Sequence, residues 1–250
     1  MNGDFLSLLP RSPFSSLGTK DASLTPLEGT TVFAFHWRDG VLIAGDHRAT
    51  AGNVIFSDRT EKIVDLDHRS LIAIAGSPAV AFEMARTLQT TFEFYRRSQL
   101  QSMSLPAKIR ALSRLLHENL PATLQGIGLV APIFAGLGEE SERPMIYFYD
   151  PLGAQFEAAS FAGSGSGSGS IKSVLHYLEE WGNPKPNEMD LAEAVVLASR
   201  LLMTAAEFDS ATGGVHPENN LFATIKVLTV DGVRSIESEE QNTFWEGGAS

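Results

Sequence analysis

The chain has 250 residues, 43% of them hydrophobic and 20% charged, with a formal net charge of −11, and this length can bury one substantial core as a single domain. The acidic balance argues against a nucleic-acid binder and against a protein of anionic membrane surfaces, because both need a basic face to neutralise phosphates. The absence of cysteine excludes disulfides, thiolate catalysis and cysteine-ligated metals, and it is compatible with a reducing, cytoplasmic compartment.

The first 29 residues differ in character from the rest of the chain. They contain Pro10, Pro13 and Pro26 with scattered serines and threonines, and they show no sustained hydrophobic period. They also lack the basic start and the continuous apolar run of a secretory signal. No apolar stretch of the chain reaches the ~20 residues that a membrane helix needs. We therefore expect an irregular leader over residues 1–29 and one domain over residues 30–250.

The segment after the leader predicts a strand meander followed by two helices. The apolar runs TTVFAFHW and GVLIAG flank a turn at residues 38–40, and NVIFSD, KIVDLD and LIAIAG continue the strand pattern. Apolar side chains of residues 78–100 recur at helical spacing behind Pro78. A second helix is predicted over residues 105–125, where Pro121 should kink or end it.

The second half of the chain repeats this order of strands and helices. Strands are predicted at PIFAGLG, PMIYFYD and AQFEAASFAG, and helices at SIKSVLHYLEEW and MDLAEAVVLASRLLMTAAEF, the latter with Asn187 as its N-cap. Strands at NLFATIKVLTV and VRSIES close the pattern, and the tail over residues 233–250 has no clear assignment.

Segregated blocks of strands and helices favour an α+β fold over alternating βα units. Two sheets packed face to face, with a helix pair on each outer face, would bury every apolar stripe. We therefore expect a layered sandwich.

Familiar motifs of nucleotide, zinc and serine chemistry are absent from the sequence. There is no GxGxxG before a helix, no P-loop, no HExxH and no GxSxG. The six histidines are scattered, and no two have metal-ligand spacing on one predicted face. The sequence therefore predicts neither a metal site nor another cofactor.

Three positions in the first half are candidates for chemistry. Asp46 ends a strand in AGDHRAT, Lys62 begins KIVDLD, and Gly76 lies where IAIAGSP passes from strand to helix. Each also has a plain structural interpretation: a turn or cap acid, a solvated edge lysine and a turn glycine. The functional interpretation of Gly76 is a backbone N–H for a developing oxyanion. The pattern alone leaves both interpretations open.

Two later segments are equally ambiguous. GSGSGSGS, residues 163–170, has the composition of a flexible linker. It lies, however, directly between a strand and an amphipathic helix, where loops are commonly short, and its glycines permit close backbone approach. In FDSATGG, residues 208–214, Asp209, Ser210 and Thr212 could be no more than a helix stop before a glycine turn.

Taken in order, these segments resemble the β subunits of the proteasome core, most closely the bacterial, actinobacterial type. The motifs are GTTVFAF, AGDHRAT, the lysine of the next strand, AGSPA before a long helix, GSGS before another helix, and DSATGG. The similarity extends from Gly29 to about Gly232. It implies an N-terminal nucleophile hydrolase with a four-layer α-β-β-α sandwich of two antiparallel sheets.

The resemblance also implies a chemistry. Cleavage between Gly29 and Thr30 would remove residues 1–29 as a propeptide, and Thr30 would then supply a nucleophilic hydroxyl and an α-amine that acts as its base. Lys62 would promote loss of the hydroxyl proton, Asp46 would position Lys62, and the N–H of Gly76 would stabilise the oxyanion.

The remaining site residues follow from the same resemblance. Ser166, Asp209 and Thr212 match the family's supporting serine, acid and hydroxyl, although Ser164 or Ser168 could replace Ser166 because the tract is longer than usual. Thr50 and Gly76 would align a substrate peptide as an added strand. The first specificity pocket would be shaped by Ala49, Ile74 and Pro78, whose small or apolar character suggests cleavage after apolar residues.

The expected function is thus that of a threonine endopeptidase made as a proenzyme, which degrades unfolded protein in the cytoplasm. The resemblance implies seven-membered β rings stacked between α-subunit rings and an ATPase ring that delivers substrate. Two alternatives stay open: a structural ring subunit without activity, and an HslV-type ATP-dependent peptidase. The latter family is shorter and normally lacks so long a leader.

Overall fold

The computed structural model describes residues 30–51, 54–126, 128–139, 141–216 and 221–248. Its strands form two five-stranded antiparallel sheets and a small two-stranded ribbon. The first sheet has the order β10-β1-β2-β11-β12, with bounds β10 Phe161–Gly165, β1 Thr31–Trp37, β2 Gly40–Gly45, β11 Thr224–Thr229 and β12 Gly232–Ile236. The second runs β5-β6-β7-β8-β9, with bounds β5 Ile63–Asp67, β6 Ser70–Ala73, β7 Ile133–Gly136, β8 Met145–Tyr149 and β9 Gln155–Ala158. The ribbon pairs β3 Ala49–Ala51 with β4 Val54–Ser57.

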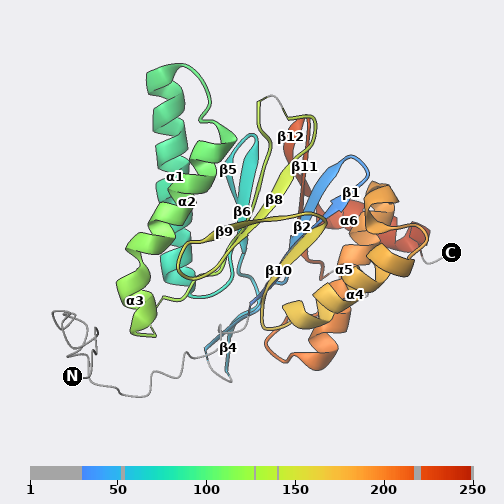
Figure 1. The fold of residues 1–250 in the computed structure, drawn as a ribbon. Helices are drawn as coiled ribbons and strands as arrows, with labels where there is room; N and C mark the ends of the chain where they lie inside the picture. The colour runs from blue at the N-terminus through green and yellow to red at the C-terminus, as the bar shows by residue number, and fades with distance from the viewer. Residues whose placement is uncertain (1–29, 52–53, 127, 140, 217–220, 249–250) are drawn as a thin grey trace, which may run out of the picture.

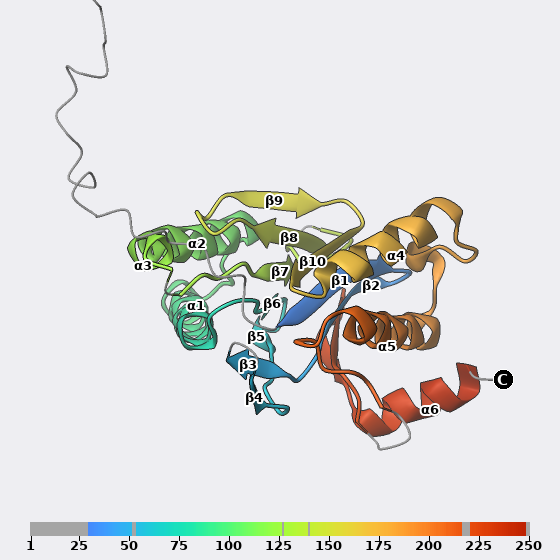
Figure 2. The same ribbon diagram turned by 90° about the horizontal axis from the view of Figure 1, so that it is seen from below.

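The helices lie outside the two sheets. Their bounds are α1 Pro78–Gln99, α2 Leu105–Glu118, α3 Leu120–Leu124, α4 Ser168–Trp181, α5 Leu191–Phe208 and α6 Ser238–Gly248, with a short 3-10 turn at Pro186–Glu188. Figure 1 shows α1 and α2 on one side of the sheets and α4 and α5 on the other. Figure 2, seen from below, shows the succession of helices, sheet, sheet and helices.

Three hydrophobic clusters fill the spaces between these layers. One joins α4 and α5 to the outer face of the first sheet, and it includes Phe33 and Phe35 of β1. The second lies between the two sheets, and the third joins α1 and α2 to the second sheet around Phe134. The predicted four-layer α-β-β-α sandwich of two antiparallel sheets is therefore confirmed.

Most predicted elements are present, and one predicted strand is divided. The run AQFEAASFAG, predicted as one strand, forms β9 and β10, which belong to different sheets. The chain turns at Ala159 and Ser160, and the carbonyl of Ser160 accepts the backbone N–H of His36 at 3.0 Å. This bond directs the following residues onto β1, so one apolar run serves both sheets.

Pro121 separates two helices, as its ring geometry predicts. Helix α2 ends at Glu118, and Pro121 occupies the first turn of α3, where its missing N–H costs no intrahelical bond.

The predicted N-cap of α5 was wrong. Asn187 lies in the preceding 3-10 turn, and the cap is Asp190, whose carboxylate accepts the N–H of Glu193 while Glu193 accepts the N–H of Asp190. This reciprocal capping box satisfies two backbone donors, which makes Asp190 the stronger cap.

The unassigned tail contains an ordered helix. Helix α6 lies beside α5, where Arg200 stacks over the ring of Trp245 at 5.9 Å. Its Gln241 is buried and donates to the carbonyls of Ala223 and Ile236, at the start and end of the last hairpin. The tail is thus tied to the first sheet by hydrogen bonds as well as by packing.

A buried lysine joins the two sheets near the end that carries Lys62. Lys226 of β11 has its Nζ 3.0 Å from Glu61 Oε1 and 3.1 Å from Asp65 Oδ1. Glu61 and Asp65 bracket Lys62 in sequence, so the contacts fix the start of β5 against the first sheet. No helix in the part of the chain described is long and apolar enough to cross a membrane.

Candidate active site

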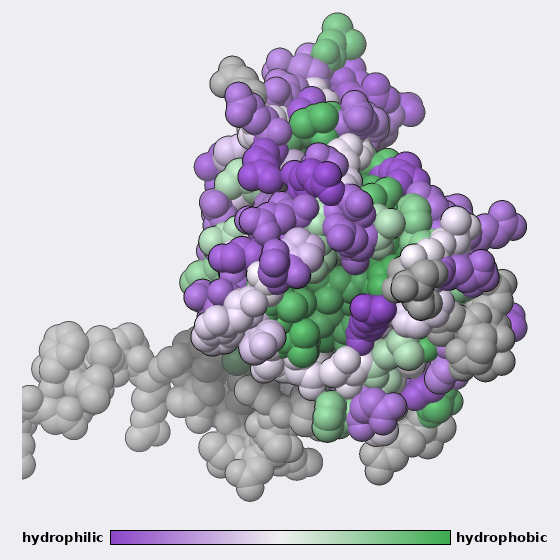
Figure 3. Space-filling model, turned by 90° about the vertical axis from the view of Figure 1, so that its right-hand side faces the viewer, coloured by the Kyte–Doolittle hydropathy of each residue, from purple (hydrophilic) through white to green (hydrophobic). Residues whose placement is uncertain are grey.

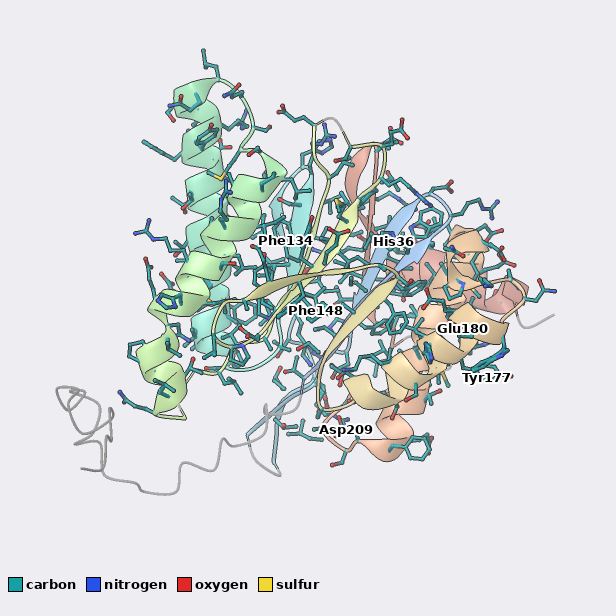
Figure 4. The ribbon with its side chains drawn as sticks, in the orientation of Figure 1. His36, Phe134, Phe148, Tyr177, Glu180 and Asp209 are labelled. Carbon is teal, nitrogen blue, oxygen red and sulfur yellow. The ribbon has the colours of Figure 1, made fainter. Side chains whose placement is uncertain are left out.

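Five of the predicted catalytic residues come from separate places in the chain that meet at one end of the sandwich. Thr30 immediately precedes β1, Asp46 follows β2, and Lys62 precedes β5. Ser166 lies in the turn between β10 and α4, and Asp209 follows α5. Figure 4 shows Asp209 at the lower end of α5. Gly29, the other half of the predicted cleavage site, lies outside the described residues together with the rest of the leader.

Asp46 and Lys62 form a buried ion pair. The Nζ of Lys62 lies 2.6 Å from Asp46 Oδ1 and 2.5 Å from the carbonyl oxygen of Arg48. Asp46 also accepts three backbone N–H groups, from Thr31 at 3.0 Å, Arg48 at 2.9 Å and Gly213 at 2.8 Å. A carboxylate with four donors is held in one orientation, and it holds Lys62 in turn.

Burial changes the acidity of this lysine. Desolvation lowers the pKa of Lys62, and the neighbouring carboxylate of Asp46 offsets this only in part. The ammonium form is therefore less favoured than in a free lysine. A lysine of lowered pKa can give up and take back a proton closer to neutral pH, which is the property that a proton shuttle needs.

A second cluster is centred on Asp209. Its Oδ2 accepts hydrogen bonds from Ser166 Oγ and Thr212 Oγ1, both at 2.6 Å, and its Oδ1 accepts the N–H of Ala211 at 3.1 Å. Burial alone would raise the pKa of Asp209, but these hydrogen bonds to the charged form outweigh it and hold the pKa below its usual value. Asp209 is therefore a stable anion.

The buried hydroxyl of Thr31 links this cluster to the start of β1. Thr31 Oγ1 lies 2.6 Å from Thr212 Oγ1 and accepts the N–H of Gly167 at 3.0 Å. The single proton of the Thr212 hydroxyl is donated to Asp209, so Thr31 must be the donor to Thr212. The chain of bonds orients the residue directly after Thr30.

The Ser-Gly tract is an ordered part of the site and not a linker. Its first residues complete β10, and Ser168 begins α4. Ser164 donates to the carbonyl of Ala131 at 2.7 Å, which leaves Ser166 as the serine that contacts Asp209 in the described structure. The backbone N–H of Ser166 donates to the carbonyl of Thr30 at 3.2 Å, so the tract also holds Thr30 itself.

Two glycines of this tract let its backbone lie close to Thr30, Thr31 and Thr212. Gly165 has φ +95°, and a Cβ on it would lie 1.6 Å from the carbonyl oxygen of Thr30. A Cβ on Gly167 would lie 2.5 Å from Thr212 Oγ1 and 2.7 Å from Thr31 Oγ1. Any side chain at either position would displace the residues around Thr30.

Gly76 lies at the junction between the second sheet and helix α1. It has φ +110° and forms an isolated antiparallel bridge with Val130. The two hydrogen bonds of this bridge are donated by Ser77 to Leu129 and by Ala131 to Ala75. The bridge therefore leaves the N–H of Gly76 unused.

The predicted substrate-binding residues are spread over three elements. Ala49 and Thr50 belong to β3 and are half-buried. Ile74 is buried in the cluster beneath α1, and its N–H donates to the carbonyl of Lys62 at 2.8 Å. Pro78 is exposed as the first residue of α1. Their role in substrate binding stays a prediction.

Sequence reasoning missed Arg48 and the Thr31 hydroxyl. The guanidinium of Arg48 donates to the carbonyl of Ser210 at 3.1 Å and pairs with Asp58 at 3.0 Å, so it ties the Asp209 loop to the segment after β2. The position of Arg48 in AGDHRAT, two residues after Asp46, was the available signal. No comparable signal marks Thr31, because its partner Thr212 is 181 residues away.

Comparison with known proteins identifies the family of this chain. The family model for proteasome subunits matches residues 27–216, which is most of the chain. The chain belongs to the proteasome subunit family.

The relatives of this proteasome subunit are β subunits by name. Proteasome subunit beta 2 of Thermomonospora curvata is 37% identical over 212 residues, which cover 85% of this chain and 73% of the relative. The proteasome subunit beta of Acidimicrobium ferrooxidans is 35% identical over 94% of this chain and 84% of its own length. That of Streptomyces griseus is 32% identical over 96% and 84%. The chain is accordingly a β-type proteasome subunit.

Proposed function

We propose that this subunit is a threonine endopeptidase, in which Thr30 becomes the amino-terminal nucleophile when residues 1–29 are removed. The observation that carries the proposal is the buried network around the start of β1. In it Asp46 holds Lys62 and the backbone of Thr31, while Asp209, Ser166 and Thr212 hold the Thr31 hydroxyl and the Thr30 carbonyl.

The network supplies what a threonine hydroxyl lacks. A hydroxyl is a weak nucleophile until a neighbouring base takes its proton. An ammonium group has three donors, and Asp46 and the Arg48 carbonyl occupy two of those on Lys62. The third can be directed at the hydroxyl of Thr30, and in the neutral form Lys62 can accept its proton. The lowered pKa of Lys62 favours this exchange.

The same hydroxyl accounts for the removal of the leader. Thr30 Oγ1 attacks the carbonyl carbon of Gly29 and loses its proton to the base. The C–N bond of the Gly29–Thr30 peptide then breaks, the nitrogen takes up the proton, and an ester remains. Water hydrolyses this ester, which releases the Gly29 carboxylate and restores the hydroxyl. The freed α-amine has a reference pKa of ~7.7–8.0, so it can serve as the base in later turnovers.

Peptide hydrolysis would repeat these steps on a substrate. The Thr30 hydroxyl attacks the scissile carbonyl, and the N–H of Gly76 stabilises the tetrahedral oxyanion, a contribution of typically ~2.7–4 kcal/mol. The amine product leaves with a proton, and water hydrolyses the acyl ester. Thr50 and Gly76 align the substrate backbone, and Ala49, Ile74 and Pro78 form the pocket for an apolar side chain.

The subunit would act inside an assembled core. We propose seven-membered β rings that stack with proteasome α subunits and receive unfolded protein from an ATPase ring in the cytoplasm. Figure 3, the face at the right of Figure 1, shows a contiguous hydrophobic area among hydrophilic residues. Large side chains are also exposed on α4 and at the end of α5, namely Tyr177, Trp181 and Phe208. Exposed apolar surface of this kind supports association with other subunits.

A fluorogenic peptide assay on the assembled particle tests the proposal. Thr30→Ala removes the hydroxyl oxygen that forms the ester in this mechanism, so hydrolysis should fall to background. Thr30→Ser keeps a hydroxyl and is the matched control, which should retain measurable activity. Undiminished hydrolysis by the Thr30→Ala particle would contradict the proposal, and so would an inactive wild-type particle, which would identify a structural ring subunit.

A further inference from the structure

A cavity of about 140 Å³ lies outside the candidate active site. It is lined by residues of β1, the turn before β10, helix α4, the 3-10 turn and Arg143, and it is partly open to solvent. Figure 4 shows that His36, which lines it, and Asp209, which belongs to the active site, lie well apart in the molecule. None of the residues that line this cavity belongs to the proposed catalytic set.

The cavity as a whole has about the volume of a single side chain, and part of its lining is apolar. Its apolar lining consists of Phe35, Ala159, Phe161, Leu175 and Pro186. For comparison, a cavity of about 150 Å³ lined by aliphatic and aromatic side chains can hold benzene. The space is therefore large enough for one aromatic or branched aliphatic side chain.

Two opposite charges line the same cavity without pairing with each other. Arg143 and Glu179 both line it, and within the described ranges no ion pair joins them. Among the residues that the structure describes, Arg143 donates one hydrogen bond, to the carbonyl of Arg38 at 3.3 Å, and Glu179 accepts one from the hydroxyl of Ser160. A guanidinium has five N–H donors and a carboxylate about four acceptor sites, so each keeps most of its capacity.

The other basic residue that lines the cavity, His36, is uncharged at neutral pH. Burial lowers the pKa of His36, and the nearby charge of Arg143 lowers it further, so the imidazole is neutral at neutral pH. Arg143 is then the cation available to an anionic ligand group, and its planar fork suits a carboxylate.

We propose that this cavity binds a free α-amino acid with an aromatic or branched apolar side chain. The carboxylate of the ligand pairs with Arg143, its ammonium group pairs with Glu179, and its side chain fills the apolar part. A zwitterion with an apolar group is the ligand class that can contact Arg143, Glu179 and the apolar lining at the same time. This binding is independent of the peptidase chemistry proposed above.

Calorimetry on the assembled particle tests the proposal with four probes. L-phenylalanine carries all three features, phenylacetate lacks the ammonium group, phenethylamine lacks the carboxylate, and toluene lacks both. A ligand of the size of phenylalanine should bind with a Kd of roughly 0.1–1 mM. Loss of either charged group should weaken binding about tenfold.

Variants locate the binding. Arg143→Met should weaken phenylalanine and phenylacetate about tenfold, and Glu179→Gln should weaken phenylalanine and phenethylamine to a similar degree. Arg110→Met, which removes an exposed arginine of α2 outside the cavity, is the matched control and should change nothing. If Arg143→Met fails to fold by circular dichroism, Glu179→Gln still tests the site. Absence of saturable phenylalanine binding, or equal binding by wild type and the folded variants, would overturn the proposal.

Discussion

Gly165 is the residue at which the geometry around Thr30 is least tolerant of change. Alanine there would place a Cβ 1.6 Å from the Thr30 carbonyl oxygen and would hold an L-residue at φ +95°. The backbone term alone costs ~1–2 kcal/mol, and the clash must move Thr30. Since a misplacement of ~1 Å at a reacting group can cost ~100-fold in rate, Gly165→Ala should lower peptide hydrolysis at least tenfold.

Gly169→Ala is the matched control for this substitution. A Cβ at Gly169, in the first turn of α4, meets no atom within 4 Å, so the variant should keep wild-type activity and stability. If Gly165→Ala is as active as Gly169→Ala in the fluorogenic assay, the close approach to Thr30 is not required.

Asp209 gives the site a defined response to acid. Its pKa is lowered in the folded chain, because the hydrogen bonds from Ser166 and Thr212 outweigh the effect of burial. The stabilisation is therefore fully present above the unfolded value near 3.8 and is lost as the pH falls through the lower folded value. Urea unfolding between pH 6 and about 3 should show a steeper loss of stability for wild type than for Asp209→Asn.

The control for Asp209→Asn is the same substitution at an aspartate outside the site. Asp231→Asn changes an exposed turn residue and should leave the slope of the wild type unaltered. Parallel curves for wild type and Asp209→Asn would show that Asp209 does not contribute in this way.

At the scale of the element, the start of α5 offers a direct test of the corrected cap. Asp190→Ala removes the side-chain acceptor of the Glu193 N–H and should lower the free energy of unfolding by ~1 kcal/mol. Asn187→Ala changes the residue that the sequence favoured as cap and should have a much smaller effect. Denaturant unfolding of the two variants decides between them, and a larger loss for Asn187→Ala would contradict the assignment.

The elements themselves were largely predictable from the sequence. Alternating or apolar runs bounded by turns located most strands, and helical spacing with Pro78 and Pro121 located the ends of α1 and α2, because these signals are local. The two wrong predictions depended on a contact distant in sequence or on competition between neighbouring residues. AQFEAASFAG divides between two sheets through a bond from His36 to Ser160, and Asp190 outcompetes Asn187 through a reciprocal bond with Glu193.

The site was predictable only in part, for a similar reason. Ordered motifs identified Asp46, Lys62 and Asp209, but no spacing in the sequence reveals which side chains meet. Thr31 and Thr212 are 181 residues apart, and Arg48 reaches Ser210 across 162 residues. The helix α6 lacked a family motif, and its attachment depends on Gln241, a residue type with no special signature.

At the scale of the whole molecule, the two sheets serve as a frame that brings five chain segments together at one end. Lys226 joins the sheets beside Lys62, and the Asp46 carboxylate joins the start of β1 to the Asp209 loop through Thr31 and Gly213. The described domain holds Thr30 buried. On this account, the fold assembles the site first, and cleavage then frees the α-amine that completes it.

The intact mass of the chain in the assembled wild-type particle tests this account most directly. The account predicts a chain that has lost residues 1–29 and begins at Thr30, and it predicts that Thr30→Ala particles keep the leader. A wild-type chain that retains residues 1–29 in active particles would contradict the account.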